Sequence, residues 1–292
     1  MVSVKNLSDT EVEIRGEINV ADLESHRKGV IEKLQERVDL PGFRKGHVPE
    51  NIIRERVGPI AILEDMAIEA IKSVYPAIIV EHKIAAIDRP EVTLTKIAEG
   101  SSLEFVIKQA VIPKVKLPDY KDIAKKAGVE VIEPAESEKD AEGKEVPKPT
   151  PEQLEQIKQN KKRERISDAM LENCKFIVPP VMVERQLDAF MDEMSARVES
   201  MGMKFDDYIK AMKREKASLR DDLRVEAEKR VRLSLILDTI AMEEKVEIPK
   251  EELDKEVGFL IKHNPEVSET DARSYIHGIL RTQRVFTLLE SV

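Results

Sequence analysis

A polar, proline-containing segment at residues 119–150 sets the strongest limit on how this 292-residue chain can fold. The segment is rich in Glu, Lys and Pro, and beyond its first few positions it has almost no large apolar side chain. Because it buries too little surface to offset the entropy that ordering costs, we predict a charged, flexible linker. The chain should accordingly fold as two domains, over residues 1–118 and 151–292.

Residues 1–118 combine strand patterns with helix patterns. Apolar and charged residues alternate near both ends of this stretch, which is typical of half-buried strands. In between, apolar residues at helical spacing predict a helix that Asp22 caps and that runs to Val38. A short helix ended by Gly58 and a longer helix kinked at Pro76 follow. This half is therefore predicted to be a compact α+β domain.

Residues 151–292 show helix patterns throughout. Pro180 and Pro249 stand at the start of two predicted helices, and Ser268 is placed to cap the last one. The stretches that follow the two prolines share a weak pattern of apolar residues, which favours structurally equivalent helical arms. We therefore predict an α+β N-terminal domain, a linker, and an all-α C-terminal domain with helical arms.

Charge and cysteine content narrow the function classes. A net charge of −9 argues against general nucleic-acid binding, so any contact with RNA should be local. Cys174 is the single cysteine, which excludes an intramolecular disulfide and favours a reducing compartment. The first residues lack the pattern of a signal peptide, and no stretch approaches the roughly 20 apolar residues of a membrane span. We expect a soluble cytoplasmic protein without membrane contact.

The sequence carries no catalytic or metal-binding signature. Its five histidines are scattered without a second ligand at metal spacing, and phosphate-binding, dinucleotide-binding and nucleophile motifs are absent. Cys174 is best explained as a small buried side chain. The basic run at 161–165 fits a charged helix face better than a nucleic-acid patch, because acidic residues flank it and no aromatic interleaves. We therefore expect no enzyme, no metal and no cofactor.

Methionine is concentrated in one part of the helical half. Six of the ten methionines lie there, namely Met182, Met191, Met194, Met201, Met203 and Met212. The methionine side chain is flexible and polarizable, so exposed clusters fit varied apolar partners, whereas buried ones fill a core. Both interpretations stay open from the sequence.

The stretch "LPGFRKGHVP" at residues 40–49 lies between two predicted helices. Its glycines permit backbone conformations that other residues avoid, and its prolines stop the preceding helix, so Gly42, Gly46 and Pro49 shape a short loop. The side chains held outward are Phe43, Arg44 and Lys45. An exposed phenylalanine gains nothing unless a partner covers it, and cations here can pair with phosphates or acidic side chains. The alternative is that Phe43 tucks under its own domain.

At this loop the sequence resembles the trigger factor family of ribosome-associated bacterial chaperones. The family signature G-F-R-x-G-x-x-P matches residues 42–49, which lie between two helices after an N-terminal strand, as in the family. The likeness extends over nearly the whole chain, including "VYPAIIVEHKIAAIDRPEV" and "FIVPPVMVERQLDAFM". It implies that Phe43, Arg44 and Lys45 dock on a ribosomal protein and adjacent rRNA at the exit tunnel.

The resemblance further implies an ATP-independent chaperone that shields nascent polypeptides, with the six methionines as candidate client contacts. Most trigger factors insert an FKBP-type prolyl isomerase domain after the stretch that ends here near Tyr120. A segment of about 30 polar residues is too short for such a domain, so isomerase activity is not carried over. A residual prolyl isomerase, or a SurA-like holdase that acts without the ribosome, remains as an alternative. A weak homodimer off the ribosome is left open.

Overall fold

The structure, a computed structural model, describes residues 2–41, 43–128 and 150–292, and the chain divides into two compact units. The first unit comprises Met1–Lys114 with Pro179–Val181, and the second comprises Val115–Val178 with Met182–Val292. Each unit has hydrophobic clusters of its own.

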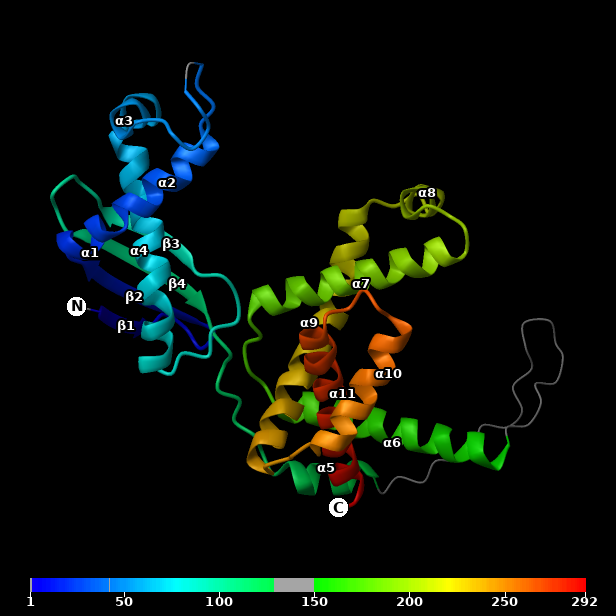
Figure 1. Cartoon of the computed structure of the whole chain (residues 1–292). Helices are drawn as coiled ribbons and strands as arrows, with labels where there is room; N and C mark the ends of the chain where they lie inside the picture. Colours follow the sequence, from blue (N-terminus) through cyan, green and yellow to red (C-terminus); the bar gives the residue numbers. More distant parts are fainter. Residues whose placement is uncertain (1, 42, 129–149) are drawn as a thin grey trace. The chain divides into compact units, whose positions relative to one another are not determined.

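The first unit is built on a four-stranded antiparallel sheet (Figure 1). In sheet order its strands are β1 (Val2–Asn6), β2 (Glu11–Ile18), β4 (Leu103–Ala110) and β3 (Glu91–Lys96). The alternation in the sequence places apolar residues on one face, where Ile14 lies opposite Ile107 and both are fully buried. Gly16 lies opposite Phe105, and a Cβ at Gly16 would fall 2.3 Å from the phenylalanine ring. Glycine is therefore required where the ring crosses β2.

Four helices complete the core of this unit, and α4 crosses the sheet in Figure 1. They are α1 (Val20–Ser25), α2 (Arg27–Arg37), α3 (Glu50–Val57) and α4 (Pro59–Glu81). The prediction of one helix capped by Asp22 is wrong. The Asn19 side chain accepts the Asp22 backbone N–H at 2.9 Å and so caps α1, and the helical run breaks at His26. Helix α4 continues through Pro76.

The second unit contains seven helices within its described residues, and no strand among them. They are α5 (Tyr120–Gly128), α6 (Pro151–Asn173), α7 (Pro180–Ser200), α8 (Phe205–Ala211), α9 (Lys216–Glu243), α10 (Lys250–His263) and α11 (Glu269–Glu290). A body cluster joins α5, α6, α9 and α11 through buried residues that include Ile166, Ile240 and Val285. Cys174 is buried in this cluster, as predicted, and burial raises the pKa of its thiol. The predicted fold class is confirmed: an α+β N-terminal part and an all-α C-terminal part.

Two helical hairpins extend this unit. Helices α7 and α9 pack against each other through a cluster that includes Leu187 and Val231, and a second cluster adds Phe205 and Ile209 of α8. Arg220 on α9 reinforces the pair by donating to Glu184 and Asp188 on α7 at 2.7 and 2.6 Å. Helices α10 and α11 form the second hairpin around Leu253, Val257, Ala272 and Leu280.

The predicted linker begins later than the sequence indicates. Residues 120–128 form α5, in which Ala124 is fully buried and Ile123 and Ala127 pack against the body cluster. The Tyr120 hydroxyl also donates to Glu244 at 2.5 Å, and burial together with this carboxylate raises the pKa of Tyr120 to about 12. Long-range packing therefore orders a stretch whose composition alone favours disorder. The remainder of the predicted linker, residues 129–149, lies outside the described residues.

The basic run at 161–165 serves the packing of α6 on α11. Lys162 donates to the Glu290 backbone carbonyl at 2.7 Å, and Arg163 pairs with the Glu290 carboxylate at 2.6 Å. The Arg163 guanidinium also lies 5.6 Å from the centre of the Phe286 ring. Both cations therefore hold the last turn of α11. This agrees with the prediction that the run is a charged face of a helix rather than a nucleic-acid patch.

Candidate functional site

The loop between α2 and α3, residues 38–49, is fastened to its own domain at both sides. The Gly46 N–H donates to the Gln35 carbonyl at 3.0 Å, and the Gln35 side-chain Nε2 donates to the Val48 carbonyl at 2.8 Å. The Val48 side chain is fully buried in the core of the first unit, and Leu40 packs against the same core. The residues between Leu40 and Gly46 therefore project from two fixed points.

The tip of this loop exposes the three outward residues that the sequence predicts. Phe43 is 41% exposed and belongs to no hydrophobic cluster of the described residues, so it does not tuck under its own domain. Arg44 and Lys45 are exposed and make no ion pair within the part of the chain that the structure describes. Turn hydrogen bonds from the Phe43 N–H to the Leu40 carbonyl and from the His47 N–H to the Arg44 carbonyl shape the tip.

Of the predicted loop-shaping residues, Gly46 has the clearest role. Its φ is +82°, in the left-handed region that favours glycine, while a Cβ there would meet no atom within 4 Å. Its need for glycine is therefore conformational rather than steric. Pro49, with φ −58°, is the cap residue of α3, which begins at the next residue, Glu50. Gly42 lies outside the described residues.

Two further arginines near the loop, Arg27 and Arg54, are engaged in ion pairs. Arg54 on α3 donates to both carboxylate oxygens of Glu99 at 2.8 Å. Arg27 on α2 binds Glu24 at 2.6 Å, lies 3.5 Å from Glu50, and holds the pKa of Glu24 below its usual value. These pairs tie α1, α2, α3 and the β3–β4 turn together. Arg44 and Lys45, in contrast, make no ion pair among the described residues.

Three residues that the sequence does not single out hold the loop and its flanking helices, namely Gln35, Arg27 and Glu99. Their contacts join positions far apart in the chain: 13 residues separate Gln35 from Val48, and 45 separate Arg54 from Glu99. No local pattern marks such pairs. The only sequence signal was the glycine and proline content of the loop itself.

The six clustered methionines fall into two groups. Met182, Met191 and Met194 are half-buried and pack against the clusters between α7 and α9. Met201, Met203 and Met212 are 76%, 47% and 42% exposed, at the two turns that flank α8. A hollow of about 350 Å³ is lined by residues of α7, α8 and α9 that include Met191 and Phe205 but none of these three methionines. Core packing therefore accounts for three methionines, and an available apolar surface remains at the α8 end of the hairpin.

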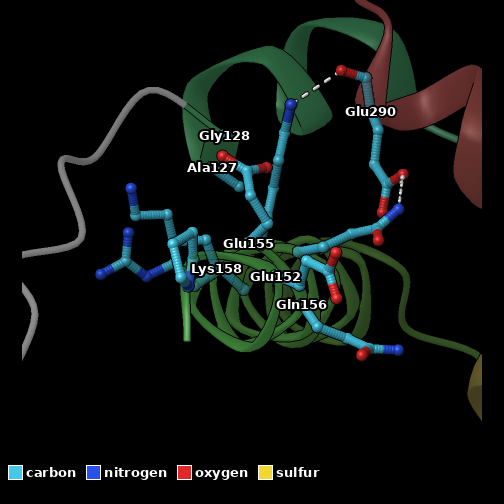
Figure 2. A pocket seen from close by; sticks show the side chains of 11 residues that line it. Ala127, Gly128, Glu152, Glu155, Gln156, Lys158 and Glu290 are labelled. Atoms are coloured by element: carbon cyan, nitrogen blue, oxygen red, sulfur yellow. Dashed lines mark hydrogen bonds between the residues drawn. The ribbon is translucent and has the colours of Figure 1, made fainter. Parts of the chain in front are cut away.

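A wider hollow of about 810 Å³ lies between α5, α6 and the end of α11 (Figure 2). Glu152, Glu155 and Lys158 line it from α6, and Glu290 lies across from them (Figure 2). None of the predicted site residues belongs to its wall. No group of three His, Cys, Asp or Glu side chains in the described ranges is arranged to hold a metal ion. The described helices also include none that is long and apolar enough to cross a membrane.

Family comparisons cover both units. The family described as "Bacterial trigger factor protein (TF)" matches residues 1–146, and "Bacterial trigger factor protein (TF) C-terminus" matches residues 144–282. No family model for a peptidyl-prolyl isomerase domain matches the chain. The two matches therefore meet within the segment that the sequence analysis assigns to the linker.

Individual relatives agree with this result. The trigger factor of Rhodococcus erythropolis is 36% identical over 121 residues, which cover 41% of this chain and 26% of that protein. The chain thus aligns with about a quarter of the length of the Rhodococcus relatives. The trigger factor of Bacillus subtilis is 24% identical over 366 aligned positions, covering 82% of this chain and 86% of that protein. Because this chain has only 292 residues, the Bacillus protein carries residues without a counterpart here.

A solved structure described as "Promiscuous Substrate Recognition in Folding and Assembly Activities of the Trigger Factor Chaperone" has the same fold. The TM-score is 0.56 at 15% sequence identity, and the superposition covers 99% of both chains. This likeness extends the agreement from the sequence to the arrangement of helices and strands.

Proposed function

The chain belongs to the bacterial trigger factor family, and on this premise we propose that it is an ATP-independent chaperone that docks at the ribosomal exit tunnel. Its partners would be a ribosomal protein with adjacent rRNA on one side and unfolded nascent polypeptides on the other. Docking near the tunnel raises the effective concentration of a weak client-binding surface, so broad and reversible contacts suffice.

The observation that carries this proposal is the exposed tip of the loop at 38–49. It presents a phenylalanine and two cations without an ion pair among the described residues, from a backbone held by hydrogen bonds, in a protein whose net charge is −9. A ring can fill an apolar pocket, while arginine and lysine pair with phosphate or carboxylate groups. The tip therefore suits a mixed surface of protein and RNA.

The client surface is assigned to the α8 end of the α7–α9 hairpin. Met201, Met203 and Met212 are exposed there and can adapt to different apolar side chains at low conformational cost. The half-buried Met182, Met191 and Met194 support the hairpin instead. We therefore propose client contact for three of the six methionines, Met201, Met203 and Met212.

We further propose that the chain acts without prolyl isomerase activity, because the two family matches adjoin where most trigger factors insert that domain. The purified protein should not accelerate a proline-limited refolding reaction. Detectable catalysis would favour the residual-isomerase alternative. The loop tip speaks against a SurA-like holdase, since an exposed docking group has no use without the ribosome.

Co-sedimentation with purified bacterial ribosomes tests the docking role. Changing Phe43, Arg44 and Lys45 together to Ala should abolish most binding while shifting stability by no more than about 0.5 kcal/mol per site, as expected for surface residues. Wild-type binding should weaken with salt if phosphate contacts contribute. Suppression of aggregation of a free, unfolded client should survive. A triple variant that still pellets with ribosomes, or that melts early, would contradict the proposal.

A further inference from the structure

Gln35 contacts the loop at 38–49 through both its main chain and its side chain. It lies in the last turn of α2, where helix carbonyls lack partners within the helix, and its carbonyl accepts the Gly46 N–H at 3.0 Å. Its amide Nε2 reaches past this bond and donates to the Val48 carbonyl at 2.8 Å. One residue therefore fixes the loop at two positions on the side that leads into α3.

These two hydrogen bonds limit the freedom of the tip. Gly46 is the first residue after Lys45, and its φ of +82° turns the chain back toward α2. Without the Gln35 contacts the backbone at residues 43–47 would sample more conformations, and a partner would have to order it on binding. A fixed backbone removes that entropy cost in advance.

We propose that Gln35 is the positioning residue of the docking loop, which holds Phe43, Arg44 and Lys45 in their binding arrangement before the ribosome is met. The inference rests on the docking function proposed above and adds a residue that itself touches no partner. It acts through the backbone of residues 46–48. The affinity of docking thus depends on a side chain in α2 as well as on the tip.

Gln35→Met tests the proposal because it keeps the length and the main-chain carbonyl but removes the amide donor. We expect ribosome affinity to fall about fivefold, the effect of one typical intramolecular hydrogen bond. The dependence of binding on salt should keep its slope, because Arg44 and Lys45 are unchanged. The Gly46 amide should exchange hydrogen faster. Gln156→Met, the same change at an exposed position on α6, is the matched control and should alter none of these quantities.

Gly46→Ala tests the same contact from the loop, at the residue whose N–H donates to the Gln35 carbonyl. Its Cβ would meet no atom within 4 Å, so the substitution strains only the backbone at φ +82°. We expect a several-fold loss of ribosome affinity and only a small fall in the melting temperature, because the strain is confined to one residue. This variant keeps the proposal testable if Gln35→Met folds poorly.

The outcomes separate this inference from the docking function. If Gln35→Met and Gly46→Ala bind ribosomes as tightly as the wild type while the triple tip variant does not, Gln35 is not a positioning residue and docking stands. If the triple tip variant also binds normally, the docking function itself fails. Weaker binding accompanied by a reduced salt slope would also overturn the inference, because it would mean lost phosphate contacts rather than lost positioning.

Discussion

The loop at 38–49 and the turn at 201–204 are two exposed tips with similar backbone features but different side chains. Each contains a glycine in the left-handed region, Gly46 at φ +82° and Gly202 at φ +81°. Each is held by backbone hydrogen bonds, to the Gln35 carbonyl in the loop and to the Val198 carbonyl in the turn. A glycine and backbone hydrogen bonds thus shape both tips, and the side chains that the tips present differ.

The loop presents one stiff aromatic ring and two cations, whereas the turn presents methionines. A phenylalanine has two rotatable side-chain bonds and a fixed shape, and cations require complementary charge, so the loop suits one partner surface. Methionine has three rotatable bonds and a polarizable sulfur, so the turn suits many partners. The stiffness of the side chains at each tip would therefore explain the proposed difference between one docking partner and many clients.

The largest expected effect on stability comes from weakening the packing between α7 and α9, because α7 leads into the methionine turn at 201–204. Leu187 is fully buried between α7 and α9, so Leu187→Ala should leave a cavity and lower the free energy of unfolding by about 2–5 kcal/mol. Chemical denaturation measures this loss. Aggregation suppression should fall while ribosome binding persists. A parallel loss of ribosome binding would show that the two tips are not independent.

Gly16→Ala adds volume instead of removing it, and it lies in the sheet of the first unit, which carries the loop at 38–49. The new methyl group would fall 2.3 Å from the Phe105 ring, so we expect overpacking to cost about 1–3 kcal/mol. Ribosome binding should weaken, and suppression of client aggregation should remain. Equal damage to both activities would contradict the assignment of one activity to each tip. Gly29→Ala is the control, because a Cβ at Gly29 would meet no atom within 4 Å.

Replacing the exposed methionines should separate the proposed activity of the turn from that of the loop, with little effect on the fold. Met201, Met203 and Met212 changed to Ser should each shift the free energy of unfolding by about 0.5 kcal/mol or less, as is usual for surface positions. Client aggregation assays should show the loss instead. The matched variant changes Met182, Met191 and Met194 to Ser and should lower thermal stability clearly. If the exposed set behaves like the matched set, the turn is part of the core.

The smallest effect concerns the attachment of α2, which carries Gln35, to α4. Lys33 on α2 and Lys72 donate to Glu69 at 2.7 and 2.9 Å, and these bonds lower the pKa of Glu69 from 4.5 to about 2. A lowered pKa stabilises the fold above pH 4.5, and this contribution is lost as the pH falls from about 4.5 to about 2. Because both lysines are largely exposed, Glu69→Gln should cost only about 0.5 kcal/mol at neutral pH.

Urea denaturation of wild type and Glu69→Gln at pH 7 and at pH 3 measures that contribution. The difference between the two proteins should shrink at the lower pH. A difference that grows toward acid would have the wrong sign and would exclude this ion pair as its source.

Much of the fold was predictable because it depends on local patterns. Alternation located β2 and β4, and the glycines and prolines located the loop, since both signals lie within ten residues. Helix α5 was missed because Ile123 and Ala124 find their packing partners on α6 and α11, far along the chain. The cap at Asn19 was missed because Asp22 is an equally good capping residue by type.

The candidate site was predictable only in part, for a similar reason. Phe43, Arg44 and Lys45 lie within one motif, and their exposure follows from the shape of the loop. Gln35 serves the loop through contacts that no periodicity reveals. The methionines could not be divided from the sequence, because the same side chain fits a core and a surface equally well.

The contacts of Lys162 and Arg163 on α6 with Glu290 on α11 constrain the order in which the helical unit can assemble. Lys162 and the Glu290 carbonyl are 128 residues apart in the chain, and Val285 and Leu289 complete the cluster that buries Cys174. During vectorial synthesis the earlier helices must wait, with part of their apolar surface uncovered, until α11 has left the tunnel. A protein proposed to shelter emerging chains thus completes its own helical core late in synthesis. The protease sensitivity of ribosome-bound chains stalled before and after α11 would show how long the earlier helices stay uncovered.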